Sequence, residues 1–181
     1  MEKLVLIDGH SILNRAFYGV PNLTNSEGLH TNAVYGFLNI LFNVLDEEKA
    51  DYLAVAFDLK APTFRHKMFD AYKGTRKPMP EELHEQVPLM KEVLTAMGVP
   101  ILTKEGYEAD DILGTIAKRE QKDGYEVTIL SGDRDLLQLS DTHIRICLPK
   151  TSRGTTEVHN YYPEDVIREY QVTPEQFIEV K

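Results

Sequence analysis

Short apolar runs and amphipathic segments alternate along the chain. The apolar runs are rich in Val, Ile and Leu and are bounded by polar residues or glycine, which predicts buried strands. These runs span residues 3–8, 52–58, 99–103, 125–130 and 143–148. A weaker run at 155–158 predicts a minor strand.

Segments between the runs place apolar side chains three and four positions apart, which is typical of helices with one buried face. They span residues 32–48, 81–97, 108–122 and 163–170. Thr31 is in position to cap the first helix, and Gly98 to end the second. This alternation predicts an α/β fold, in which a central, mostly parallel twisted sheet carries helices on both faces.

Two segments do not fit this pattern. Residues 59–80 lack a clean periodicity, and a loop of that length in a compact domain is usually functional or disordered. Residues 173–181 begin like a helix, but Phe177, Ile178 and Val180 have little left to pack against. We therefore expect one domain over residues 1–172, followed by the start of a region that is cut short.

Charge is distributed unevenly along the chain. The formal net charge of −9 argues against a nucleic-acid partner, because polyanions bind basic surfaces. Residues 60–77, however, contain six basic residues and only one acid, Asp70. An acidic centre beside a basic segment fits a protein that binds cations first and a polyanion second.

Cysteine content and hydropathy exclude several classes of protein. The single cysteine, Cys147, rules out an internal disulfide framework, and its apolar neighbours predict a buried packing residue. No run approaches the ~18 apolar residues of a membrane span. The N-terminal apolar stretch is short and ends in Asp8, so it is not a signal peptide. We expect a reducing, cytoplasmic location and no membrane partner.

Acidic residues occur where the predicted strands end. Asp8 closes the first strand and Asp58 the second. Three acids open the helix after the third strand and two follow the fourth: Glu108, Asp110, Asp111, Asp133 and Asp135. Because the carboxyl ends of parallel strands share one edge of a sheet, we expect all of these carboxylates to converge there.

Carboxylates held together raise one another's pKa and destabilise the fold unless a cation neutralises them. Oxygen donors without cysteine or clustered histidine select hard ions such as Mg²⁺ or Mn²⁺. Two such ions about 4 Å apart can stabilise the attacking and the leaving oxygen of a phosphoryl displacement. Each acid alone could be a turn residue or a favourable charge at a helix N-terminus, so the metal prediction rests on the joint pattern.

Nearly the whole chain resembles the N-terminal 5′ nuclease domain of bacterial DNA polymerase I, a member of the flap endonuclease superfamily with a PIN-like fold. The resemblance rests on a series of short motifs that occur in the family's order and spacing. They are Leu-Ile-Asp-Gly-His-Ser, Thr-Asn-Ala-Val-Tyr-Gly-Phe, Val-Ala-Phe-Asp, Thr-Phe-Arg-His, Tyr-Lys-Gly-Thr-Arg, Tyr-Glu-Ala-Asp-Asp-Ile and Ser-Gly-Asp-Arg-Asp-Leu.

The resemblance implies a metal-dependent 5′-3′ exonuclease and 5′-flap endonuclease that acts on DNA flaps, nicks and branched duplex ends in replication and repair. It implies two Mg²⁺ or Mn²⁺ ions. The ligands implied for the first ion are Asp8, Asp58, Glu108 and Asp110, with Asp111 close by. Those implied for the second are Asp133 and Asp135. His10 lies in the predicted turn after Asp8 and stays outside the metal set.

The resemblance also implies that residues 59–80 form a gateway over the site, past which the unpaired 5′ strand runs. Lys73 and Arg76 are implied to contact the phosphate and to neutralise its charge in the transition state. Arg15 is expected to reach a phosphate, and Lys77 and Arg65 to bind substrate. Tyr72 could stack on an unpaired base or anchor the loop, and the sequence leaves both possibilities open.

In the family, further aspartates for the second ion follow, then a helix-hairpin-helix region and polymerase domains. Residues 173–181 would be the start of that region, so we expect an incomplete second site and weak or absent turnover by this chain. Three other hypotheses remain: a PIN-like ribonuclease, a non-catalytic fragment that binds metal or DNA, and a phosphotransfer domain with an aspartyl nucleophile.

Overall fold

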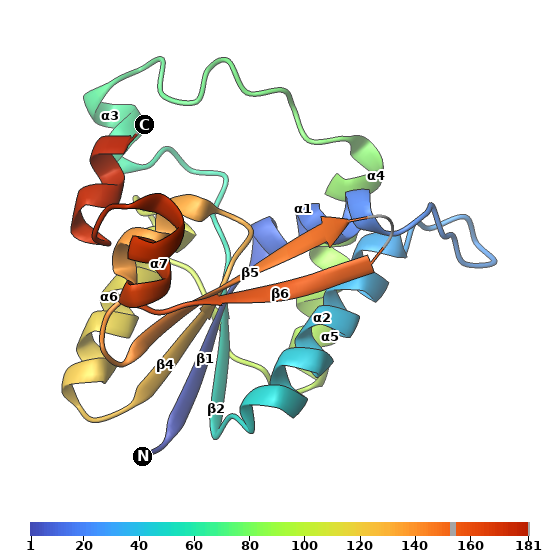
Figure 1. Cartoon of the computed structure of the whole chain (residues 1–181). Coiled ribbons are helices and arrows are strands. Elements are labelled where there is room, and N and C mark those ends of the chain that lie inside the picture. Colours follow the sequence, from blue (N-terminus) through green and yellow to red (C-terminus); the bar gives the residue numbers. More distant parts are fainter. Residues whose placement is uncertain (153–154, 181) are drawn as a thin grey trace.

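A six-stranded sheet forms the centre of the molecule in the computed structural model, which describes residues 1–152 and 155–180 (Figure 1). The strand order is β3-β2-β1-β4-β5-β6. The strands are β1 Lys3–Asp8, β2 Tyr52–Ala56, β3 Ile101–Leu102, β4 Glu126–Leu130, β5 Ile144–Ser152 and β6 Thr155–Tyr161. The first five are parallel, and β6 alone runs antiparallel, to β5. The predicted fold class, a mostly parallel α/β sheet, is confirmed.

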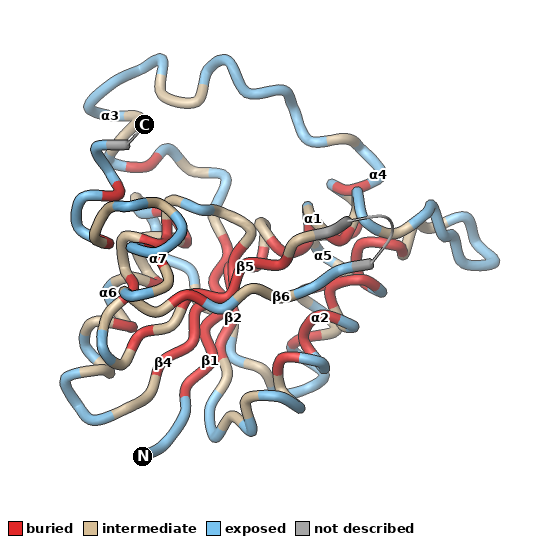
Figure 2. The backbone as a smooth tube through the Cα atoms, viewed as in Figure 1, coloured by how far each residue is buried: buried red, intermediate tan, exposed pale blue. Residues whose placement is uncertain are grey.

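Helices cover both faces of the sheet and bury a separate core on each (Figures 1 and 2). One core lies under α1 Gly9–Gly19, α2 Asn32–Glu48 and α5 Gln86–Ala96. The other lies under α6 Ala109–Lys122, α7 Pro163–Tyr170, and the 3₁₀ helices η1 Arg134–Leu139 and η2 Glu175–Val180. Strand β1 is buried from Leu4 to Asp8 because its alternate side chains enter the two cores.

Several elements differ from the sequence prediction. The sequence pattern did not predict helix α1. His10, expected in a turn after Asp8, lies in the first turn of this helix. The predicted helix 81–97 divides at Glu85 into α4 Glu81–His84 and α5. The third strand shrinks to two residues, and the minor strand extends to residue 161 by pairing with β5. Cys147 is buried, as predicted.

Thr31 occupies the N-cap position of α2 but its side chain does not cap the helix. The acceptor comes instead from Gln86, whose Oε1 accepts hydrogen bonds from the N–H groups of Ala33 (2.8 Å) and Val34 (3.2 Å). Its Nε2 donates to Asn32 Oδ1 (2.9 Å) and to a backbone carbonyl of α4 (2.9 Å). This fully buried amide therefore joins the start of α2 to the residues that follow the gateway.

The last described segment packs better than its sequence indicated. Phe177 is only 8 % exposed and joins the core beneath α6 and α7. Its ring meets that of Tyr170 edge to face, with centroids 5.1 Å apart. The expectation that Phe177 lacks packing partners is wrong, whereas Ile178 is indeed exposed. The side chain of Val180 lies outside the described residues.

Within the two described ranges, none of the helices combines the length and apolar character that crossing a bilayer requires.

Candidate active site

The first carboxylate of the site lies where β1 meets α1. Asp8 is the N-cap of α1, and its Oδ1 accepts a hydrogen bond from the N–H of Ser11 (3.3 Å). Its Oδ2 accepts a hydrogen bond from the hydroxyl of Ser131 (3.0 Å). With 5 % exposure the carboxylate is almost completely buried, and these two donors fix its orientation.

Ser11 and Ser131 hold the loop after β4 against this acid. The hydroxyl of Ser11 accepts a hydrogen bond from the N–H of Gly132 (2.8 Å), and that of Ser131 accepts one from the N–H of Asp133 (3.1 Å). Asp133 in turn caps η1 by accepting from the N–H of Asp135 (2.9 Å). Sequence reasoning missed both serines, although Ser11 lies three residues after Asp8 and Ser131 two residues before Asp133.

Asp58 brings the end of β2 to the start of α6. Its Oδ1 accepts a hydrogen bond from the N–H of Ala109 (2.7 Å). Its own N–H donates to His10 Nδ1 (3.3 Å), and that ring nitrogen lies 3.9 Å from Asp58 Oδ2. Burial lowers the pKa of His10, and the charge of Asp58 opposes that shift. His10 therefore contacts the acid-bearing loop, a neighbour that its place in the sequence did not reveal.

Four acids near the edge of the sheet interact electrostatically: Asp8, Asp58, Asp110 and Asp133, here called the sheet-edge acids. Burial raises the pKa of Asp8 to about 6, with further contributions from Asp58 and Asp133. Burial also raises the pKa of Asp110 to about 7, and the charges of the other three acids and of Glu108 add to that shift. The predicted convergence of carboxylates is thus visible as mutual repulsion.

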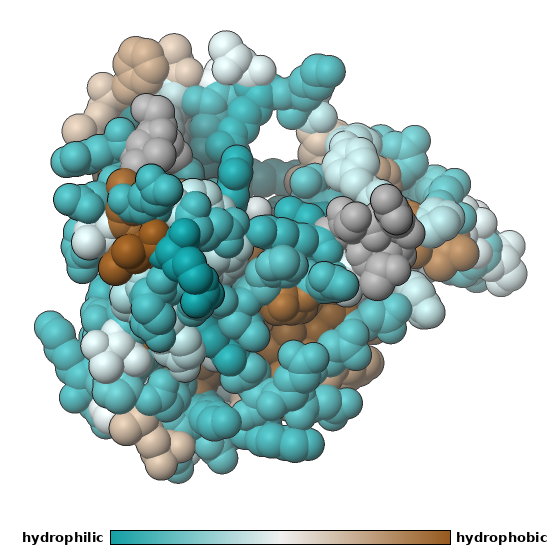
Figure 3. All heavy atoms as spheres, in the orientation of Figure 1, coloured by the Kyte–Doolittle hydropathy of each residue, from teal (hydrophilic) through white to brown (hydrophobic). Residues whose placement is uncertain are grey.

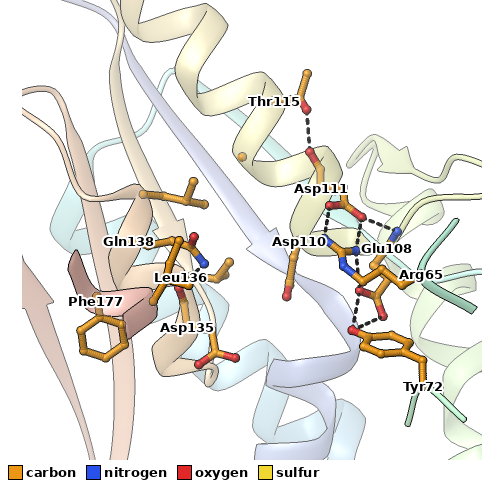
Figure 4. A pocket seen from close by; sticks show the side chains of 13 residues that line it. Arg65, Tyr72, Glu108, Asp110, Asp111, Thr115, Asp135, Leu136, Gln138 and Phe177 are labelled. Atoms are coloured by element: carbon orange, nitrogen blue, oxygen red, sulfur yellow. Dashed lines mark hydrogen bonds and ion pairs between the residues drawn. The ribbon is translucent and has the colours of Figure 1, made fainter. Parts of the chain in front are cut away.

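Glu108, the N-cap of α6, and Asp111, in its first turn, face the gateway instead. The guanidinium of Arg65 donates two parallel hydrogen bonds to Asp111, each 2.8 Å, and a third of 2.8 Å to Glu108 Oε2. The pKa of Asp111 is lowered, chiefly by its hydrogen bonds with Arg65. These residues form the gateway pairs, in which side chains of residues 59–80 neutralise acids of α6 (Figure 4).

Lys73 and Tyr72 complete the gateway pairs. The ammonium of Lys73 forms an ion pair with Glu108 Oε1, and the hydroxyl of Tyr72 donates to Glu108 Oε2 (3.2 Å). Burial lowers the pKa of Lys73, but the bond to Glu108 and its charge outweigh that and leave the pKa raised. Lys73 has a backbone φ of 59°, a left-handed conformation that costs a lysine about 1 kcal/mol. In this structure Tyr72 acts as a loop anchor.

The remaining predicted residues lie around this centre. Asp135 and Asp110 line a cavity of about 450 Å³ between α6 and η1 (Figure 4). Arg15 lines a separate cavity of about 320 Å³ with Ser11 and Gly132. Arg76 and Lys77 are exposed. They belong to the part of the gateway that arches away from the sheet (Figure 1). The surface beneath this arch is hollowed (Figure 3).

The donor set suits a hard divalent cation, because it consists of carboxylate oxygens whose mutual repulsion a cation would relieve. Among the described residues, however, no group of three Asp, Glu, His or Cys side chains is already arranged to hold an ion. Glu108 is turned toward the gateway, and Asp58 is engaged by the N–H of Ala109. The structure brings the predicted acids together without closing them into a ligand shell.

Comparison with known proteins agrees with this geometry. Residues 3–171 match the family described as the 5′-3′ exonuclease, N-terminal resolvase-like domain.

The chain belongs to this family.

Its relatives include DNA polymerase I of Bacillus caldotenax and of Bacillus subtilis, each 48 % identical over 180 residues. The alignment covers 99 % of this chain and 20 % of each relative, so the chain spans about one fifth of the length of these family members.

Solved structures show the same fold. The D15 protein of bacteriophage T5, crystallised with metal ions, has a TM-score of 0.72 at 23 % identity, covering 99 % of this chain and 65 % of its own. Human GEN1, in complex with Holliday junction DNA, has a TM-score of 0.57 at 13 % identity, covering 98 % of this chain and 42 % of its own. The arrangement of strands and helices is therefore common to proteins that have diverged widely in sequence.

Proposed function

We propose that the chain hydrolyses phosphodiester bonds at 5′ ends of DNA, as a 5′-3′ exonuclease and flap endonuclease that depends on divalent metal ions. Membership of the 5′-3′ exonuclease family supports the reaction class. The phage T5 relatives support the metal and the nucleic acid, since one is described as a flap endonuclease in complex with DNA and metal ions.

One observation carries the proposal. Acids from β1, from β2, from the first turn of α6 and from the loop after β4 meet at one edge of the sheet, and burial together with their mutual charge raises the pKa of Asp8 and Asp110. A fold gains nothing from such repulsion unless a cation binds there. The first ion would be held by Asp8, Asp58, Glu108 and Asp110, and the second by Asp133 and Asp135.

Either Mg²⁺ or Mn²⁺ fits these oxygen donors. When bound, the ions supply a Lewis acid that lowers the pKa of water and stabilises charge on the leaving oxygen. Glu108 is paired with Lys73 in this structure. If Glu108 held an ion, the ammonium of Lys73 would be available to a phosphate oxygen. Lys73, Arg76 and Arg15 would then neutralise negative charge that develops on the phosphate.

The substrate would reach the acids beneath the gateway. Residues 60–77 are basic, and the surface beneath the arch is hollowed (Figure 3). Tyr72 and Lys77 would contact the unpaired 5′ strand, and Arg65 would line its path while it stays bound to Asp111. We assign residues 1–172 to the catalytic core and 173–181 to the start of a DNA-binding region, with polymerase domains following in the longer protein.

A direct test compares cleavage of an end-labelled 5′-flap DNA with cleavage of a single-stranded RNA of the same sequence, with Mg²⁺ or Mn²⁺. We expect cleavage of the flap only, at a low rate because the second metal site is incomplete, and none in EDTA. Mn²⁺ binding provides a readout that needs no turnover. It is measured as the decrease in the electron paramagnetic resonance signal of free Mn²⁺. Cleavage of the RNA alone would favour the ribonuclease, and absence of Mn²⁺ binding would refute the metal site.

A further inference from the structure

We propose that Asp111 anchors the gateway to α6 by holding Arg65, and that the metal ions are bound by the other acids. This assigns a positioning role to an acid that the sequence pattern places with the metal ligands. The inference deepens the proposed function and rests on it for the metal site, while the anchor itself can be tested without metal.

Both oxygens of Asp111 already accept hydrogen bonds. Its Oδ1 accepts one N–H of Arg65 and its Oδ2 accepts another, both at 2.8 Å, which is the two-pronged geometry that a guanidinium and a carboxylate prefer. Oδ2 also accepts the backbone N–H of Glu108 (3.0 Å), the reciprocal half of the capping box that begins α6. The backbone bond holds the carboxylate toward the gateway before Arg65 arrives.

Asp110, the preceding residue, shows the alternative orientation. One residue along an α-helix turns the side chain by about 100°, so two adjacent acids cannot face the same partner. Asp110 extends away from Arg65 and interacts electrostatically with Asp8, Asp58 and Asp133 (Figure 4). No side-chain hydrogen bond occupies Asp110 among the described residues, whereas Asp111 has three donors. The first turn of α6 therefore sorts its acids into one for the cluster and one for the gateway.

The gateway has few other means of staying docked. Its helix α3 Phe64–Met68 is five residues long, contains no buried residue and is too short to be stable alone. Apart from the gateway pairs, it is held by the N–H of Phe64, which donates to Gly106 O (2.8 Å), and by a tilted contact between the rings of Phe64 and Tyr107. Met68 and Phe69 are 81 % and 64 % exposed. The charge pairs must supply much of the docking free energy.

Docking through Asp111 also places the residues that would meet substrate. Tyr72 and Lys73 follow α3 by one short turn, closed by the N–H of Tyr72 donating to Phe69 O (2.9 Å). Arg65 therefore fixes the start of the stretch that carries them, whichever partner Lys73 then takes. If Asp111 held a metal ion instead, Arg65 would have to leave it, and this anchor would be lost whenever the site was loaded.

The experiment compares Asp111→Asn and Arg65→Gln with Asp110→Asn, the neighbouring change of equal size and charge. Hydrogen exchange of the peptide covering residues 60–77 is followed by mass spectrometry on the metal-free chain, with the exposed residues 21–28 as the internal reference. We expect exchange about tenfold faster in Asp111→Asn and in Arg65→Gln, and within about twofold of the unaltered chain in Asp110→Asn. The double variant should again be about tenfold faster, since both changes remove the same pair.

Mn²⁺ affinity gives the second readout. Asp110→Asn should weaken Mn²⁺ binding by at least about tenfold, and Asp111→Asn by less than about threefold. The proposal is overturned if Asp111→Asn weakens Mn²⁺ binding as much as Asp110→Asn, or leaves exchange of residues 60–77 unchanged. It is also overturned if the effects of Asp111→Asn and Arg65→Gln on the exchange rate multiply in the double variant. Absence of Mn²⁺ binding by the unaltered chain would refute the proposed function, while the exchange rates would still decide the anchor.

Discussion

The sheet-edge acids and the gateway pairs contain the same kind of side chain in opposite electrostatic states. Burial and neighbouring carboxylates raise the pKa of Asp110 to about 7, whereas hydrogen bonds from Arg65 lower that of Asp111. The two residues are adjacent in the sequence and share one turn of α6. The chain thus supplies its own cations where it holds a segment in place, and leaves negative charge uncompensated at the acids that we propose as metal ligands.

The difference shows that acidity alone does not identify a metal ligand. Glu108 belongs to both regions, because it adds to the repulsion at Asp110 and also pairs with Lys73. Under the proposed function, Glu108 is the residue at which metal binding and docking of the gateway would compete. Substitutions on either side of Glu108 can therefore separate the two regions experimentally.

The largest expected effect comes from removing a charge at the centre of the sheet-edge acids. Asp8→Asn should lower the rate of flap cleavage by about a thousandfold or more, because it removes a buried carboxylate that would touch the metal ion. Cleavage of labelled flap DNA in Mg²⁺, with the substitution made in the longer protein that we propose, measures this effect. The control is Asp46→Asn, an exposed acid on α2, which should leave the rate unchanged. A tenfold loss or less in Asp8→Asn would mean that the cluster is not the reaction centre.

Asp110→Asn should stabilise the metal-free chain near pH 8 by about 2 kcal/mol, allowing for partial exposure and shared charge. Because the folded pKa of about 7 lies above the ordinary value for an aspartate, ionising Asp110 opposes folding. That penalty is absent below about pH 4, grows as the pH rises to about 7, and is constant above it. Urea unfolding in EDTA near pH 5 and pH 8 measures the difference. An equal unfolding free energy for both chains near pH 8 would contradict it.

A smaller effect is expected on the gateway side. Lys73→Gln should tighten Mn²⁺ binding by about threefold, because it removes the ammonium that competes for Glu108. Lys67→Gln is the matched control, since Lys67 is exposed in the same segment and forms no ion pair among the described residues. Titration with Mn²⁺ separates the two variants. Weaker binding in Lys73→Gln would show that Lys73 supports the metal site and does not compete with it.

The smallest effect is expected for an exposed ion pair outside the site, which serves as a reference for the gateway pairs. Lys118 lowers the pKa of Asp141 to about 2 through a 2.7 Å hydrogen bond, yet both side chains are substantially exposed. Asp141→Asn should cost less than about 1 kcal/mol near pH 7. Since the folded pKa is depressed, this stability is present above about pH 4 and is lost as the pH falls through 2. Thermal unfolding of Asp141→Asn and the unaltered chain near pH 7 and pH 3 measures this difference in stability. A difference well above about 1 kcal/mol near pH 7 would contradict the prediction and indicate a buried pair.

The sequence was sufficient to place most of the acids, because each follows a strand whose apolar run is unmistakable. Asp8 ends β1 and Asp58 lies two residues beyond β2. Pairing of β1 with β2 and β4 brings the ends of these parallel strands together. Helix α1 was missed although Ile12, Leu13 and Ala16 are spaced for a buried helical face. That spacing is sufficient to predict the helix from the sequence.

Other features could not have been foreseen from local patterns. Arg65 and Asp111 are 46 positions apart, and only the docking of α3 on α6 brings them together. The basic gateway indicated phosphate contacts, and nothing in its composition showed that Arg65, Tyr72 and Lys73 would engage acids of the same chain. The roles of Arg15, Arg76 and Lys77 toward phosphate stay predictions.

The buried amide of Gln86 has a consequence for the order in which the molecule folds. It supplies the acceptor for the N–H groups of Ala33 and Val34, more than fifty residues earlier in the chain. During synthesis on the ribosome, which proceeds from the N-terminus, α2 emerges well before this acceptor exists. The first turn of α2 can therefore be completed only after the whole gateway has been synthesised and the start of α5 has docked, which makes this corner of the domain a late, non-local step of folding.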